Sequence, residues 1–225
     1  MSKRIIFGEL EPDGEVLMRF RLTYEGPIFA TQRDPIPGQP PKHTENKHQM
    51  RMVFHKQLER LWRELPALNG QHNRGYRVLL SGPGGWAQTN STSADAVAAD
   101  HKMYGKDFVP LVTDALDLVC DLDILFLRPE KPGAIVWAGD IDNRLKTLLD
   151  ALRIPEPSEK YAEHEGTPDR IFCLLEDDKL ISRVAVETDR LLMPTSENPA
   201  DHDARVVITV RLAPYSFNIT NMEFG

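Results

Sequence analysis

The sequence is poor in the features that mark specialised classes of protein. Among its 225 residues only 2 are cysteine and 8% are aromatic, and no run approaches the roughly 20 apolar residues needed to span a membrane. The first residues, MSKRIIFGELEPDGE, lack the apolar core of a signal peptide. We therefore expect a cytoplasmic protein that does not insert into a membrane.

The two cysteines do not form a CxxC motif or a Cys/His pattern. Cys120 lies in DLVCDLDI and Cys173 in RIFCLLE, both of which are apolar surroundings. We expect two buried free thiols, and a disulfide or a zinc ligand is the less favoured alternative.

The chain also lacks an excess of positive charge. Its net charge is -7, which argues against a protein whose whole surface binds nucleic acid. Acidic residues dominate from Glu156 to Asp203, but basic residues outnumber them between positions 42 and 63. This basic strip consists of Lys42, Lys47, Arg51, Lys56, Arg60 and Arg63. It is either a phosphate-binding surface or a solvated helix face.

Hydrophobic patterning predicts both strands and helices. Alternation of apolar and polar residues predicts strands at 16–24, 120–129 and 204–212 and a further strand through Val184 and Val186. Apolar spacings of three and four predict two main helices, near 46–65 and 140–152. Residues 76–81 and 134–137 are weaker strand predictions, and 107–119 fits either a helix or a strand. The expected fold class is α+β, a mixed β-sheet with two main helices packed on it.

Two segments are expected to be irregular. Residues 33–46 are rich in proline, and 81–96 are rich in Gly, Ser and Thr. The second segment lacks the Lys-Ser/Thr of a phosphate-binding P-loop, so we expect a flexible loop. Its Trp86 is a candidate for stacking on a base.

The stretch GDIDNRLKTLLDAL, residues 139–152, contains the residues most suggestive of chemistry. Ile141, Leu145, Leu148, Leu149 and Leu152 form the apolar side of a helix. Asp142, Lys146 and Asp150 follow one another at i, i+4 along a different stripe. Each of these charges has an ordinary structural explanation: a helix cap, an acid favoured by the helix dipole, or a member of a ladder of surface ion pairs.

The number of carboxylates suggests a metal site. If the chain enters the helix in an extended conformation, Asp140 and Asp142 point to the same side. Two converging carboxylates repel, and a hard cation such as Mg²⁺ keeps them ionised. A second acidic pair, Asp177 and Asp178, precedes a predicted strand and would supply further ligands, with Lys146 placed to neutralise a phosphate oxygen.

The pattern Asp-x-Asp-Asn-x-x-Lys-x-x-x-Asp-Ala-Leu at 140–152, followed by an Asp-Asp pair before a strand, resembles the RusA family of Holliday-junction resolvases. The resemblance, which includes the order of elements, covers about residues 118–212. It implies a Mg²⁺-dependent endonuclease, with Mn²⁺ as a possible substitute, that cleaves branched DNA in recombination and repair. It also implies a homodimer, because two strands of a four-way junction are cut symmetrically.

The resemblance further implies roles for individual residues. The catalytic set is Asp140, Asp142 and Asp178 as metal-binding carboxylates and Lys146 as the catalytic lysine, with Asp150 and Asp177 supporting them. Asn143, beside this set, is a candidate for DNA binding. Arg128, Lys131 and Arg144 border the same end of the predicted sheet and are candidates for contacts with the DNA backbone.

The resemblance implies a single RusA-like domain over residues 1–225, enlarged by insertions near 70–106 and 153–172. Two alternatives remain open. One is a non-catalytic DNA- or protein-binding relative of the family. The other is a Mg²⁺-dependent phosphodiesterase acting on another nucleic acid or on a nucleotide, which would suit the acidic net charge better.

Overall fold

The computed structural model describes residues 18–30, 42–65, 68, 93–129, 140–159, 166–193 and 203–215. In chain order the elements are β1 (Met18–Pro27), α1 (Lys42–Glu64), α3 (Ser93–Asp100), β2 (Lys102–Met103), β3 (Lys106–Val112), η1 (Asp114–Leu116), β4 (Leu118–Arg128), α5 (Asp140–Leu152), η2 (Pro157–Glu159), β5 (Arg170–Leu175), η4 (Asp178–Leu180), β6 (Ile181–Arg190) and β7 (Asp203–Pro214).

The described strands form two sheets. The four-stranded sheet has the order β1-β7-β4-β6, with β7 antiparallel to both of its neighbours and β6 parallel to β4. The three-stranded sheet has the order β2-β3-β5, with β3 parallel to β5. The α+β class with mixed sheets is confirmed, but the described residues contain two sheets rather than one and a third helix, α3.

The alternation predicted for residues 120–129 explains how β4 sits in its sheet. Leu122, Ile124 and Phe126 are buried on the inner face, and Asp121 and Asp123 lie on the outer face. A strand with this period of two buries one face and leaves the other in contact with solvent.

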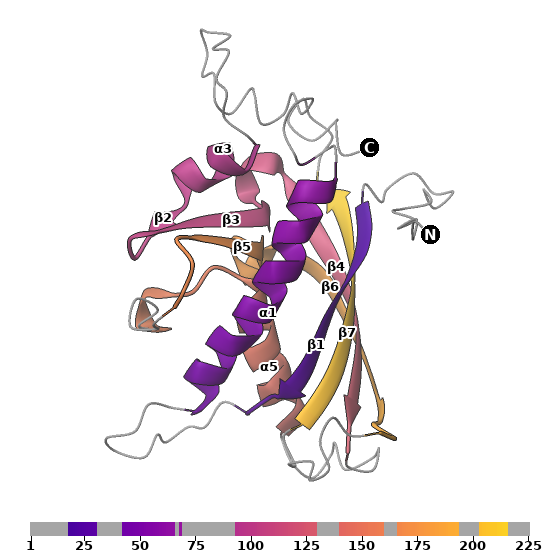
Figure 1. Cartoon of the computed structure of the whole chain (residues 1–225). Coiled ribbons are helices and arrows are strands. Elements are labelled where there is room, and N and C mark those ends of the chain that lie inside the picture. Colours follow the sequence, from indigo (N-terminus) through magenta and orange to yellow (C-terminus); the bar gives the residue numbers. More distant parts are fainter. Residues whose placement is uncertain are drawn as a thin grey trace, which may run out of the picture.

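Helix α1 lies between the two sheets. Figure 1 shows it running diagonally, with β1 on one side and the three-stranded sheet on the other. Its predicted apolar stripe, which includes Met50, Phe54, Leu58 and Trp62, is buried in the main core. Helix α5 packs beside α1 and contributes Leu148 and Leu152 to the same core.

Side chains of α1 also cap the strand edges that face it. Gln57 Oε1 accepts a hydrogen bond from the Thr23 backbone N at 2.9 Å, and Gln57 Nε2 donates to the Thr23 carbonyl at 2.7 Å. His55 Nδ1 accepts from the Phe172 backbone N at 3.1 Å, and its ring stacks on that of Phe172. These bonds satisfy backbone groups that would otherwise lie at open edges of β1 and β5.

Some local predictions were wrong. Helix α1 begins at Lys42, inside the expected proline-rich loop. The expected flexible loop at 81–96 runs into α3, which begins at Ser93. The ambiguous stretch 107–119 contains most of β3, the η1 turn and the start of β4. Predicted strands at 76–81 and 134–137, and Trp86, lie outside the described residues.

The prediction of buried free thiols is confirmed. Cys120 and Cys173 are both free and buried, and burial raises the pKa of each thiol to about 12. Neither is therefore a reactive thiolate near neutral pH. In the part of the chain that the structure describes, no helix is both long and apolar enough to cross a membrane.

Candidate metal centre

The amino-terminal half of α5 presents the predicted catalytic residues Asp142 and Lys146. Both side chains are exposed. They are four positions apart, so they are neighbours on adjacent turns of one helix face. Asn143 beside them is half-buried. Asp140 is the first residue of α5, and its side chain lies outside the described residues.

The opposite side of α5 fixes the helix in the fold. Leu148 and Leu152 are buried, as the sequence predicted, and Ile141, Leu145 and Leu149 pack against the core. Thr147 Oγ1 donates a hydrogen bond to the carbonyl of Phe29 at 3.0 Å, which ties the helix to the chain beyond β1. The face that carries Asp142 and Lys146 is thus held on a rigid element.

The expected geometry of the first acidic pair was wrong. The chain was expected to approach the helix in an extended conformation, whereas it is already helical at Asp140. At about 100° per residue, positions 140 and 142 are roughly 200° apart around the helix axis. Strand-like alternation therefore does not direct these two positions to a common side.

The second acidic pair has one structural and one exposed member. Asp177 is the N-cap of η4, and its Oδ1 accepts a hydrogen bond from the Lys179 backbone N at 3.0 Å. This bond satisfies a backbone donor at the start of the turn. Asp178 is exposed and precedes β6.

Asp142 and Asp178 lie near opposite ends of α5. The carboxyl end of the helix meets β5, since the Ile154 backbone N donates to the Leu175 carbonyl at 3.1 Å. Asp178 follows Leu175 by three residues. The 13 residues of α5 span roughly 20 Å at 1.5 Å per residue.

The four-stranded sheet gives the same result. Asp178 adjoins the start of β6, where Ile181 pairs with Cys120 near the amino end of β4. The middle of α5 lies toward the other end of the sheet, because Phe29, the partner of Thr147, follows the carboxyl end of β1. The amino end of α5 extends from Thr147 away from Ile154 and β5. Along β4 the sheet extends for roughly 26 Å from Cys120 to Arg128 at 3.3 Å per residue.

Among the predicted carboxylates that the structure describes, one chain therefore does not bring Asp142 and Asp178 together. Within them, no group of three or more His, Cys, Asp or Glu side chains is arranged to hold a metal ion. The side chain of Asp140 is not among those residues. The donor chemistry of Asp142 and Asp178 suits Mg²⁺, but the topology places the two residues toward opposite ends of α5.

Asp150, predicted as a supporting residue, belongs to a partly buried ionic cluster. Its carboxylate lies 3.4 Å from Lys47 Nζ and 3.2 Å from Arg153 Nη2. Glu159 completes the cluster, with contacts to Lys47 at 3.5 Å and to Arg51 at 3.1 Å. The cluster joins α1, α5 and η2, so Asp150 holds the helix in position.

The predicted DNA-contacting arginines are in the interior. Arg128 is 3% exposed and Arg144 is 2% exposed, so neither guanidinium is presented to a DNA backbone. The reason is their position, because Arg128 lies on the buried face of β4 and Arg144 is on a buried part of α5. Lys131 lies outside the described residues.

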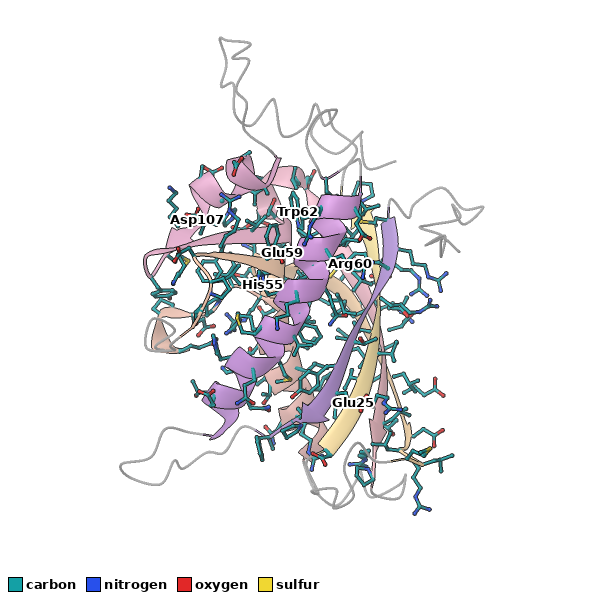
Figure 2. The ribbon with its side chains drawn as sticks, in the orientation of Figure 1. Glu25, His55, Glu59, Arg60, Trp62 and Asp107 are labelled. Carbon is teal, nitrogen blue, oxygen red and sulfur yellow. The ribbon has the colours of Figure 1, made fainter. Side chains whose placement is uncertain are left out.

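The basic strip is not a continuous cationic surface either. Lys47 and Arg51 are buried in the ionic cluster, and Arg60 and Arg63 pair with glutamates one turn away on α1. Figure 2 shows Arg60 and Glu59 on this helix. Among the strip side chains that the structure describes, Lys56 is exposed and takes no part in these ion pairs. The solvated or structural interpretation is therefore the better one.

Sequence reasoning missed a polar cluster at the Asp178 end of the molecule. His101 Nε2 lies 3.6 Å from Glu176 Oε1, and the Asp114 backbone N donates to Glu176 Oε2 at 3.0 Å. Lys179 Nζ forms an ion pair with Asp114 at 2.6 Å. Burial lowers the pKa of His101, but its bonds with Glu176 and the Val97 carbonyl outweigh burial and raise it. No local motif signals this cluster, because its members are far apart in sequence.

Comparisons of the chain with protein-family models, with curated proteins and with solved structures return no match.

Proposed function

We propose that the protein is a Mg²⁺-dependent, cytoplasmic endodeoxyribonuclease of RusA type that cleaves branched DNA such as Holliday junctions. The observation that carries the proposal is the exposed Asp142–Lys146 pair on the amino-terminal half of a helix whose other side is fixed in the core. The supporting sequence pattern is the complete Asp-x-Asp-Asn-x-x-Lys motif at residues 140–146.

The proposed chemistry divides between three carboxylates and a lysine. Asp140, Asp142 and Asp178 would hold Mg²⁺, which supplies charge stabilisation at the scissile phosphate and a bound water of lowered pKa. Lys146, one turn from Asp142, stabilises the negative charge that develops on the phosphoryl oxygens. Asn143 is half-buried beside Asp142 and is the proposed contact with the substrate.

The separation of Asp142 from Asp178 makes a homodimer part of the proposal. We consider two copies related by a two-fold axis, with the strands of their four-stranded sheets antiparallel to each other. The amino end of β6 in one copy then lies at the same end of the assembly as Asp142 in the other copy. Asp178 of the second copy then approaches the α5 helix of the first. Two such sites, related by the two-fold axis, suit symmetric cleavage of a four-way junction.

The first experiment compares four-way junction, flap and linear duplex DNA, each with Mg²⁺ and with EDTA. We expect Mg²⁺-dependent cleavage of branched DNA by the wild type and its loss in Asp142→Asn. Glu64→Gln, which alters an exposed pair at the far end of α1, is the control and should cleave normally. Wild-type enzyme that leaves every DNA intact would end the nuclease proposal. Activity confined to nucleotides or to RNA would favour the phosphodiesterase alternative instead.

A mixing experiment tests the shared site. Asp142→Asn and Asp178→Asn should each be inactive alone, because each removes one ligand from both sites of a homodimer. Mixed heterodimers contain one site with both wild-type residues, so mixing should restore nicking of one strand. If both variants are inactive and mixing restores nothing although heterodimers form, the site does not combine Asp142 and Asp178 from different copies.

A further inference from the structure

The two edge strands of the four-stranded sheet differ in how they are protected. On β1, the side chain of Gln57 occupies both backbone groups of Thr23 at the outer edge. On the opposite edge, β6 is hydrogen-bonded to β4 alone among the strands that the structure describes. Its 10 residues, ISRVAVETDR, contain neither the proline nor the lysine that often protects an edge.

The core face of β6 is also incompletely covered. Val184 and Val186 pair with Leu122 and Ile124 of β4, so all four side chains lie on the same face of the sheet. Leu122 and Ile124 are 0% and 2% exposed, whereas Val184 and Val186 are 39% and 38% exposed. The apolar surface of the core thus extends onto β6 and remains accessible there.

The sequence of β6 is complementary to a second copy of itself. In an antiparallel pair centred on Ala185, Arg183 lies opposite Glu187 of the other copy, and the same contact is repeated across the two-fold axis. Val184 then lies opposite Val186 of the other copy on the inner face. Opposite charges and β-branched pairs are the cross-strand contacts that stabilise antiparallel pairing.

We propose that β6 is the self-association edge of this protein, at which two copies pair antiparallel about Ala185 and join their four-stranded sheets into one. The occupant is a second copy of this chain, because a self-complementary strand fits an isologous two-fold contact. This inference deepens the proposed function, on which its activity readout rests, by assigning the surface of the dimer. Its structural readouts do not depend on catalysis.

Charge reversal tests the pairing by sedimentation velocity of the full chain. Glu187→Arg places two arginines opposite each other and Arg183→Glu places two glutamates opposite, so each variant should dimerise at least about tenfold more weakly than wild type. An equimolar mixture of the two variants should form heterodimers, because each Glu then faces an Arg. Arg21→Glu, an exposed reversal on β1, is the matched control and should dimerise normally.

A cysteine at the two-fold axis tests the register directly. Opposite residues in an antiparallel pair lie close enough for a disulfide, so Ala185→Cys should form a covalent dimer under mild oxidation. The native Cys120 and Cys173 are buried and do not compete. Thr23→Cys, at the capped edge, should remain uncrosslinked.

The outcomes separate the interface from the catalytic proposal. A wild type that stays monomeric at about 100 µM has a dimer Kd weaker than that concentration, and this result would overturn the β6 interface. So would single charge reversals that dimerise like the wild type. If a monomeric wild type cleaves branched DNA, the nuclease activity stands, but both the shared site and the β6 interface are lost. If charge-reversal variants that still dimerise cleave branched DNA, only the assigned surface is lost.

Discussion

Lys47 Nζ on α1 lies 3.4 Å from Asp150 Oδ2 on α5, and both side chains are largely withdrawn from solvent, with exposures of 11% and 13%. Asp150 also pairs with Arg153. Asp150→Asn would therefore remove one negative partner from each of two partly buried cations, Lys47 and Arg153. We expect the free energy of unfolding, measured in urea, to fall by about 2 kcal/mol.

Glu64→Gln provides the comparison for Asp150→Asn. Glu64 pairs with Arg60 at 2.7 Å, but this pair is exposed, so its loss should change the free energy of unfolding by no more than about 0.5 kcal/mol. Equal effects of the two substitutions would show that the Asp150 cluster does not hold α5 in place.

His55 makes stability depend on pH in a definite direction. Burial lowers the pKa of His55 below its usual value, and its Nδ1 accepts the Phe172 N–H only when unprotonated. As the pH falls through the unfolded value of about 6.5, the unfolded chain binds a proton that the folded chain does not, and stability decreases. His55→Gln keeps an acceptor without a titrating group. Urea unfolding at pH 7.5 and 5.5 should show a smaller acid loss in His55→Gln than in the wild type.

His101 provides a control of opposite sign. The pKa of His101 is raised in the folded chain, because protonated His101 interacts favourably with Glu176. This stabilisation is complete below the pKa of the unfolded chain and is lost as the pH rises through the pKa of the folded chain. His101→Gln should therefore lose more stability than the wild type between pH 7.5 and 5.5. If both histidine variants change in the same direction, the assigned causes are wrong.

The elements that sequence predicted best are those with a complete hydrophobic period. The alternation in β4 and the apolar stripes of α1 and α5 are each set by the residues of one element, so the chain itself specifies them. In contrast, β5 is short, and every residue after Arg170 is buried, so it has no alternation of apolar and polar residues to reveal it. Its pairing with β3 joins residues about sixty positions apart, which local patterns do not encode.

The candidate site divides in the same way. Exposure of Asp142 and Lys146 beside the apolar stripe of α5 followed from helical periodicity, and the structure agrees. The interior positions of Arg128 and Arg144 could not be predicted from helical periodicity or strand alternation, because burial of a charged residue depends on the elements packed above it. The distance between Asp142 and Asp178 depends on which end of the sheet each loop reaches, and that is a property of topology rather than of motif spacing.

Substitutions of Asp142 and Lys146 should separate activity from stability. Both side chains are exposed, so Asp142→Asn and Lys146→Gln should change the free energy of unfolding by less than about 0.5 kcal/mol. Lys146→Gln should nevertheless slow junction cleavage by about 100-fold, because it removes stabilisation of developing charge. Thermal unfolding and single-turnover cleavage on the same preparations measure the two quantities. A loss of activity that tracks a loss of stability would contradict a catalytic role.

Removing Gln57 should expose the edge that the fold keeps closed. Gln57→Ala deletes the hydrogen bonds to both backbone groups of Thr23, which should cost about 1 kcal/mol of unfolding free energy. It also leaves the outer backbone groups of β1 open to another strand, so association beyond a dimer should increase with concentration. Gln49→Ala is the matched control, since Gln49 bonds to Glu45 on the exposed face of α1. Light scattering that does not distinguish the two variants would show that Gln57 does not protect β1, and that another feature accounts for the difference between the two edges.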